Sequence, residues 1–193
     1  MTMSALRPAF DAATFRRALG HVPTSVAVVT ASDAQGRVGM TVGSFTSISL
    51  DPPLVGFFAD TGSATLARVQ AAGAFCVNVL TDSQNQLCRT FASRAEDRFA
   101  GVDVLPASAA TDDLAAPHRA APHLADAMAW VDCQVESVVE IGDHAVVVGR
   151  VSGLEVASGN PRPLVFFRGS LCHLDRRTLP SKGNWQRDHY AEW

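Results

Sequence analysis

Short apolar segments alternate with turn residues along most of this chain, and that alternation limits the folds open to it. Residues 24–30 are rich in β-branched side chains, as strands are. Gly36 follows at a position where a hairpin turn favours positive φ. Further strands are expected over 37–50, 54–59, 74–80, 130–141, 144–156, 164–167 and 170–174. Because these segments follow one another through turns and do not alternate regularly with helices, they predict an antiparallel β-barrel and not a Rossmann fold.

Proline and glycine mark two of the turns. The run Asp51-Pro52-Pro53 must interrupt the second strand, because neither proline can donate to a sheet ladder. Gly142 and Asp143 are expected to form the turn of a long hairpin between the strands that flank them.

Four short helices are expected beside the strands, over 12–19, 64–72, 83–91 and from 93 to about 99. Asp11 and Ser63 are predicted N-caps, because their side-chain oxygens can accept from the free N–H groups of a first helical turn. Gly20 and Gly73 are predicted left-handed residues that end the first two helices.

A chain of 193 residues suggests one domain, with a core of about 12–175, an arm at 1–11 and a tail at 176–193. The hydrophobic fraction of 47% and the charged fraction of 18% are those of a globular protein. Residues 105–127 are expected to form a surface excursion, because strands resume after them. The sequence does not decide whether Trp185 and Trp193, in the polar tail, pack on a partner subunit or are exposed to solvent.

Charge and segment length argue against several classes of partner. A net charge of −3 provides no basic surface for nucleic acid. No signal peptide is recognisable at the start, and no apolar stretch reaches the roughly 18–20 residues of a membrane helix. We therefore expect a cytoplasmic protein that binds neither nucleic acid nor a membrane.

No metal site is predicted from the spacing of cysteine and histidine. The four cysteines are Cys76, Cys88, Cys133 and Cys172. They form no C-x-x-C pair and are expected to be reduced and buried. His118 and His123 are five residues apart with Pro122 between them, and no third ligand lies nearby in the sequence.

Several segments suit a flavin. Small and hydroxylated residues from Gly39 to Ser44 would let a planar ring approach a strand backbone closely. The pair Gly62-Ser63 opens a helix whose free N–H groups favour a phosphate, and Ser93 and Arg98 flank another expected helix start. Taken alone, these residues are equally compatible with plain turns and a solvated sheet face.

Four segments in register resemble the short-chain flavin reductases, the family with the FMN-binding split-barrel fold. They are Gly39-Met-Thr-Val-Gly-Ser-Phe-Thr-Ser-Ile-Ser-Leu-Asp-Pro-Pro53, Phe75-Cys-Val-Asn-Val-Leu80 with Gln84 and Phe91, Gly142-Asp-His144, and Pro163-Leu-Val-Phe-Phe-Arg-Gly169. The resemblance spans about 15–171. It implies a mainly β, antiparallel split β-barrel with a few peripheral helices, and a homodimer.

The resemblance also implies which residues bind the cofactors. The flavin positions would be Val38, Gly39, Met40, Thr41, Gly43 and Ser44, followed by Phe58, Ala59, Asp60, Thr61, Gly62, Ser63 and Ala64. The phosphate positions would be Ala92, Ser93 and Arg98. The nicotinamide nucleotide would meet His144, which is the candidate catalytic residue through positioning, and Arg168, Gly169 and Ser170 would border the same cleft. The family often has an aromatic residue where Leu171 stands, so the nicotinamide pocket is the less certain of the two.

The activity implied is reduction of FAD or FMN by NADH, or NADPH, with reduced flavin passed to a separate monooxygenase. The sequence leaves both choices of cofactor open. One rival is a pyridoxamine-phosphate-type oxidase, which would need a basic cluster for a second phosphate beyond Arg98 and Arg168. The other is a non-catalytic flavin- or haem-binding module, which should be indifferent to pyridine nucleotide.

Overall fold

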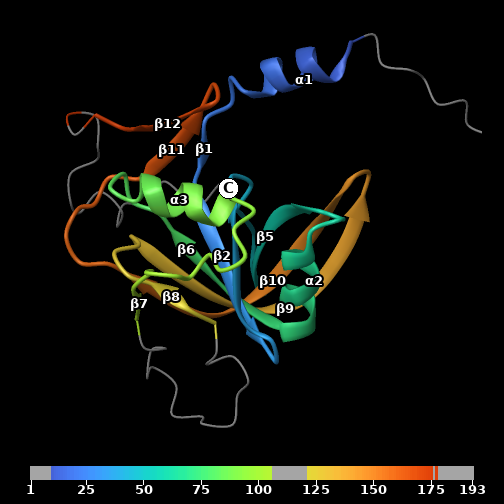
Figure 1. Cartoon of the computed structure of the whole chain (residues 1–193), viewed down its shortest axis with the longest axis vertical. Helices are drawn as coiled ribbons and strands as arrows, with labels where there is room; N and C mark the ends of the chain where they lie inside the picture. The colour runs from blue at the N-terminus through green and yellow to red at the C-terminus, as the bar shows by residue number, and fades with distance from the viewer. Residues whose placement is uncertain (1–9, 106–120, 176, 178–193) are drawn as a thin grey trace, which may run out of the picture.

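The computed structural model describes residues 10–105, 121–175 and 177, and within them the chain is mainly β (Figure 1). Seven strands form one sheet in the order β3-β2-β6-β9-β10-β5-β4, and every pair in it is antiparallel. Their bounds are β2 Ala27–Asp33, β3 Gly36–Val42, β4 Thr46–Leu50, β5 Pro53–Asp60, β6 Ala74–Val79, β9 Ala129–Ile141 and β10 His144–Val156. The mainly β, antiparallel class is therefore confirmed, and the strands described form an open ladder that ends at β3 and β4.

Two smaller sheets flank the large one. Strands β1 (Thr24–Ser25), β11 (Leu164–Phe167) and β12 (Ser170–His173) form a three-stranded sheet, and β7 (Val104–Leu105) pairs with β8 (His123–Leu124). The expected strand at 24–30 is thus divided between two sheets. The expected strand at 37–50 is divided too, because the chain turns at 43–45 to reach the opposite end of the large sheet.

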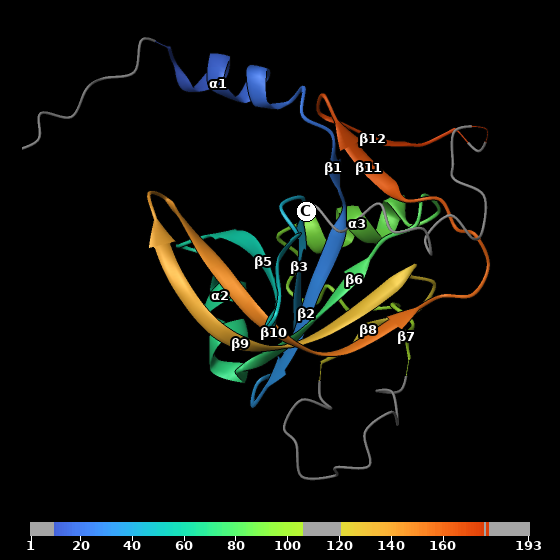
Figure 2. The same ribbon diagram turned by 180° about the vertical axis from the view of Figure 1, so that it is seen from behind.

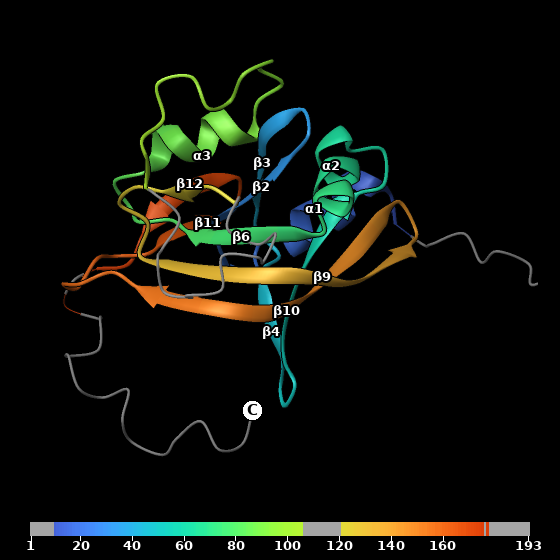
Figure 3. The ribbon, with the colours of Figure 1, turned by 90° about the horizontal axis from the view of Figure 1, so that it is seen from below.

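Three helices lie outside the sheets: α1 (Ala12–Leu19), α2 (Ala64–Ala72) and α3 (Asn85–Ala92). Figure 3 shows β6, β9 and β10 running between α2 and α3 on one side and β4 on the other. None of the helices in this described part of the chain is long and apolar enough to span a membrane. Residues 1–9 of the expected arm, 106–120 of the expected excursion and most of the tail lie outside the described residues. The prediction of a surface excursion was wrong for its end, because Ala121, His123, Leu124 and Ala127 are buried against the sheet.

The helix caps confirm most of the predictions. Asp11 and Ser63 accept hydrogen bonds from the backbone N–H groups three residues on, and Gly73 is left-handed with φ 69°. The prediction for Gly20 was wrong, since its φ is −60°. The chain there continues in a tight right-handed turn, in which the N–H of His21 donates to the carbonyl of Ala18.

The fourth expected helix does not form, because polar side chains near Ser93 bind the backbone locally. The Ser93 hydroxyl donates to the Thr90 carbonyl at 2.7 Å and accepts from the N–H of Ala95 at 3.1 Å. The Asp97 carboxylate accepts from the N–H of Phe99 at 2.8 Å. Such bonds compete with helical ones.

The large sheet is buried on both faces at β2. Alternate residues of β2 explain this: Val29 packs into a core with Phe57 and Phe75, whereas Val28 packs into a second core with Phe91. In a strand covered on both sides, an unbroken apolar run is expected in place of alternation. The first core lies under α2 and the second lies under α3, so both helices are fixed to one scaffold.

Candidate functional site

Five of the predicted cofactor-binding residues meet at a cavity of about 620 Å³: Thr41, Gly43, Ala92, Gly169 and Ser170. Thr41 and Val42 come from β3 and Gly43 follows it, Ala92 ends α3, Gly169 lies in the turn between β11 and β12, and Ser170 begins β12. The remaining walls are mostly apolar, with Val26, Cys88, Phe166 and Leu171, and one cation, Arg89. The cavity therefore joins three elements that are far apart in the sequence.

Strand β3 is at the edge of the large sheet and pairs with β2. An edge strand leaves main-chain donors and acceptors on its outer side available to other groups. The side chain of Thr41 is already committed, because its hydroxyl donates to the Cys88 carbonyl at 2.8 Å. Recognition at this position would therefore use the backbone of β3 and not this hydroxyl.

Ser44, in the connection between β3 and β4, binds β5. The N–H of Phe58, on β5, donates to the Ser44 hydroxyl oxygen at 2.9 Å, and that hydroxyl lies 3.4 Å from the carbonyl of Phe58. This bond holds the predicted residues of β3 against those of β5.

The predicted loop at 60–63 contacts the turn that precedes His144. Both the N–H and the hydroxyl of Thr61 lie 3.2 Å from the carbonyl of Asp143, to which they donate. The carboxylate of Asp60 accepts from the N–H of Gly62 at 2.7 Å and keeps this loop tight. Met40 and Ala59 pack into the core below it.

His144 is the first residue of β10 and is half-exposed. Its Nδ1 lies 2.7 Å from the Asp143 carboxylate, and this hydrogen bond holds the pKa of Asp143 below its ordinary value. The ring is thus oriented by its neighbour and half of the side chain is accessible, which suits a positioning role.

A smaller cavity of about 160 Å³ lies at the start of α2 and collects three arginines, Arg37, Arg68 and Arg98. Val38, Gly39 and Ala64 line it as well. Arg98 donates from Nη1 to the Gly39 carbonyl at 2.7 Å, and this nitrogen lies 3.4 Å from the hydroxyl of Thr65.

Arg68 is held in place by Asp33. Two parallel hydrogen bonds of 2.8 and 2.7 Å join their side chains, and Arg68 also donates to the Gly36 carbonyl at 2.8 Å. The hydrogen bonds from Arg68 lower the pKa of Asp33 to about 2. This pair ties α2 to the hairpin between β2 and β3.

The structure separates some residues that were grouped in the sequence. Ala92 lines the large cavity and Arg98 the small one, while the Ser93 hydroxyl is used in the local turn. The start of β10 and the turn between β11 and β12 lie apart from each other in Figure 1 and Figure 2. Gly169 and Ser170 line the large cavity, and His144 is not among the residues that line it.

Sequence reasoning missed Arg89, Arg37 and Arg68 as lining residues. Arg89 comes from the last turn of α3, and its position four residues after Asn85 on a short helix was the available signal. Arg37 lies with its guanidinium carbon 5.0 Å from the centre of the Phe99 ring, a contact that sequence spacing does not show.

Comparison with known proteins gives one consistent family. The chain is 44% identical over 165 residues to a flavin reductase of Pseudomonas putida, covering 85% of this chain and 91% of that protein. It is 37% identical to the reductase subunit HsaB of a flavin-dependent monooxygenase of Mycobacterium tuberculosis, covering 92% and 90%. An NADH:FAD oxidoreductase of Streptomyces globisporus, solved with NAD and FAD fragments, superposes with a TM-score of 0.78 at 30% identity, covering 91% and 99%.

The family model described as "Flavin reductase like domain" matches residues 19–175. That range takes in both cavities, the Thr61 loop and His144. The chain belongs to the flavin reductase like family.

Proposed function

We propose that this protein is an NAD(P)H:flavin oxidoreductase that reduces FAD or FMN by hydride transfer and supplies reduced flavin to a separate monooxygenase. The observation that carries this proposal is the cavity where the edge of β3 meets the end of α3 and the turn between β11 and β12, in a chain of this family. Relatives named as reductase subunits of flavin-dependent monooxygenases support the second half of it. The family match favours this activity over a pyridoxamine-phosphate-type oxidase and over a non-catalytic binding module.

The residues present fit a flavin. A volume of about 620 Å³ is within the usual range for small-molecule sites, and the walls are apolar with a free strand edge on one side. The backbone of Thr41, Val42 and Gly43 would hold the ring, and Arg89 lies at the same cavity to meet negative charge. The arginines of the smaller cavity, with the first turn of α2, would hold a phosphate.

Bound flavin and nicotinamide supply the hydride chemistry themselves, so no nucleophilic side chain is required. The chain's own part is to position the two rings and to exclude water from the contact between them. Val26, Phe166 and Leu171 provide apolar walls for this. His144, oriented by Asp143, would meet the nicotinamide nucleotide.

We also propose a homodimer in the cytoplasm. Helix α1 has no buried residue, and its exposed Phe15 stacks on the exposed Phe10 that precedes the helix, with ring centroids 5.8 Å apart. A second copy would cover these rings. The four free cysteines suit a reducing compartment.

The test is an assay of nucleotide oxidation with each pairing of NADH or NADPH with FAD or FMN. The proposal predicts that at least one pairing is consumed far faster with the protein than without it. Tight flavin binding with no acceleration by either nucleotide would identify a binding module and contradict the proposal.

A further inference from the structure

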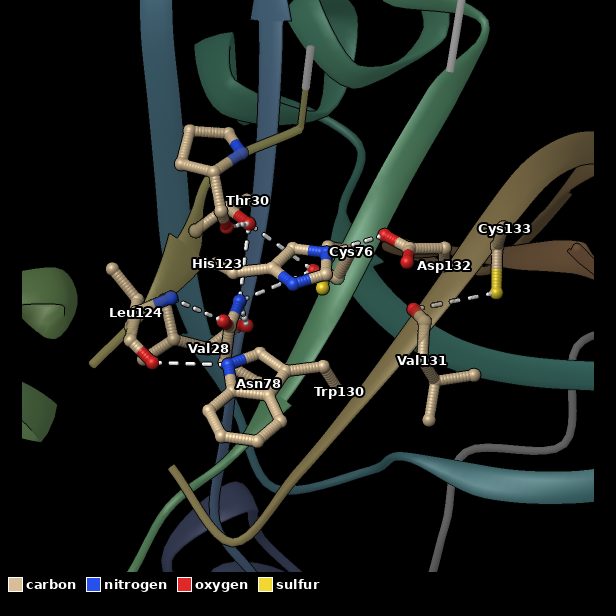
Figure 4. Close-up of polar contacts among 11 residues, drawn as sticks. Val28, Thr30, Cys76, Asn78, His123, Leu124, Trp130, Val131, Asp132 and Cys133 are labelled. Atoms are coloured by element: carbon tan, nitrogen blue, oxygen red, sulfur yellow. Dashed lines mark hydrogen bonds and ion pairs between the residues drawn. The ribbon is translucent and has the colours of Figure 1, made fainter. Parts of the chain in front are cut away.

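A cysteine, a histidine and an aspartate from three strands meet on one face of the large sheet, as Figure 4 shows. Cys76 is on β6, His123 on β8 and Asp132 on β9. Their ligand atoms all lie within 4.8 Å of one another, and His123 Nε2 is 2.8 Å from Asp132 Oδ1. None of the three lines either cavity of the proposed flavin site.

The sheet register fixes two of these side chains. Cys76 and Asp132 are directly opposite each other in the antiparallel ladder between β6 and β9. Residues in such a position point to the same face with their Cβ atoms about 5 Å apart. Their approach is therefore a property of the ladder and does not depend on a loop.

The residues on both sides of His123 in the chain are anchored by hydrogen bonds. The Thr30 hydroxyl donates to the carbonyl of Pro122, and the N–H of Leu124 donates to the Asn78 side-chain oxygen at 2.7 Å. The ring of Trp130 stacks on that of His123 with centroids 6.3 Å apart, and its Nε1 donates to the Leu124 carbonyl at 2.9 Å (Figure 4). Such support keeps a ligand in one orientation, as in protein metal sites.

Burial argues against a nucleophilic role for the cysteine of this cluster. Cys76 is fully buried and His123 is 3% exposed, whereas the Asp132 side chain is 27% exposed. Burial raises the pKa of the Cys76 thiol well above its ordinary value, so the free thiol is a poor nucleophile. An incoming group would reach the cluster past Asp132.

We propose that Cys76, His123 and Asp132 bind a divalent metal ion of the zinc class, with water in the fourth position on the Asp132 side. Thiolate, imidazole and carboxylate are the ligands zinc prefers, at about 2.3, 2.0 and 2.1 Å, and side-chain shifts of about 1 Å would bring them to those distances. The ion displaces the thiol proton of Cys76, which passes to solvent. Thiolate and carboxylate then balance its two positive charges, so burial leaves no net charge.

Bound metal would connect β8 to the ladder of β6 and β9. The role we infer is therefore a structural clasp, and it is independent of flavin reduction. Metal that binds the folded chain and not the unfolded one raises the melting temperature.

The first test is a titration of flavin-free, chelator-treated full-length protein with Co²⁺. We expect a thiolate-to-cobalt charge-transfer band in the near ultraviolet and visible bands of four-coordinate cobalt, both saturating at about one ion per chain. Zn²⁺ should abolish these bands and raise the melting temperature. No band at excess Co²⁺, with no effect of Zn²⁺ on melting, would show that the three groups only bond to one another and would overturn the proposal.

Variants assign the ligands. Cys76→Ser should abolish the charge-transfer band, whereas Cys133→Ser, which removes an equally buried sulfur next to Asp132, should keep it. Asp132→Asn keeps the volume of a partly exposed side chain and should weaken Co²⁺ binding by about tenfold or more. Circular dichroism checks that each variant is folded. If Cys76→Ser does not fold, the cobalt affinity of Asp132→Asn tests the proposal in its place. Unchanged cobalt affinity in Asp132→Asn would also overturn the proposal.

Discussion

At the scale of single residues, His144 is the candidate with the most specific proposed role. Its ring is tied to Asp143 and its position at the start of β10 keeps it away from the large cavity. We predict that His144→Ala raises the KM for the nicotinamide nucleotide about tenfold, or roughly 1.4 kcal/mol, and leaves flavin affinity nearly unchanged. Steady-state kinetics and a flavin titration measure the two effects. His21→Ala, at an exposed histidine near α1, is the matched control and should change neither.

Asp33 supplies a prediction about pH. Its pKa falls from 3.8 to about 2 because Arg68 donates two hydrogen bonds to it, so the unfolded chain binds the proton more tightly than the folded one. The stability it contributes is therefore present above about pH 4 and is lost as pH falls toward 2. Asp33→Asn should lower the melting temperature at neutral pH. The difference in melting temperature between this variant and the wild type should shrink as pH falls from about 4 toward 2. Glu136→Gln, which breaks a more exposed pair with Arg150, should have a smaller effect. A difference that stays constant with pH would contradict this account.

Single residues also show where prediction from sequence stops. Asp11, Ser63 and Gly73 were predictable, because a cap is set by residues within one turn. The neighbours of His123 were not. Its nearest polar partners, Cys76 and Asp132, are set by strand register, which sequence spacing alone does not give.

At the scale of elements, the long hairpin of β9 and β10 depends on irregularities in its ladder. The register shifts between Val148 and Gly149 and again between Val151 and Gly153. A Cβ at Gly149 would collide with Phe75 Cζ and would lie 2.9 Å from Cys133 Cβ, so only glycine fits there. We predict that Gly149→Ala lowers the free energy of unfolding by about 1–3 kcal/mol in a denaturant titration.

Gly153→Ala is the control for that change. Its Cβ would meet the Asp132 carboxylate at 3.3 Å, and that side chain is partly exposed and can move aside. A loss at Gly153 equal to that at Gly149 would show that close packing against Phe75 is not the cause. The hairpin itself was predictable from its turn, whereas these bulges were not, because they arise from packing between strands far apart in the sequence.

At the scale of the whole molecule, two features are not explained by a single chain. Helix α1 has eight residues and none is buried, although isolated helices shorter than about 12–15 residues are marginal in water. The start of β10, where His144 stands, lies apart from the turn between β11 and β12 (Figure 2), although the family resemblance implies that the two border one cleft. A second copy that packs on α1 would resolve the first feature, and it would let residues of two chains contribute to one site.

The proposed homodimer leads to a prediction that links mass to activity. Reductase activity per chain should fall on dilution as the species seen by light scattering changes from dimer to monomer. Phe15→Ala removes an exposed aromatic ring from α1 and should move this transition to a concentration about tenfold higher, which corresponds to about 1.4 kcal/mol of association energy. Arg16→Ala, on the same helix, should leave the transition nearly where it is. Because no residue of α1 is buried, Phe15→Ala should not change flavin affinity in the monomer. Full activity in a protein of monomeric mass would contradict a site built from two chains, and α1 would then need some other partner.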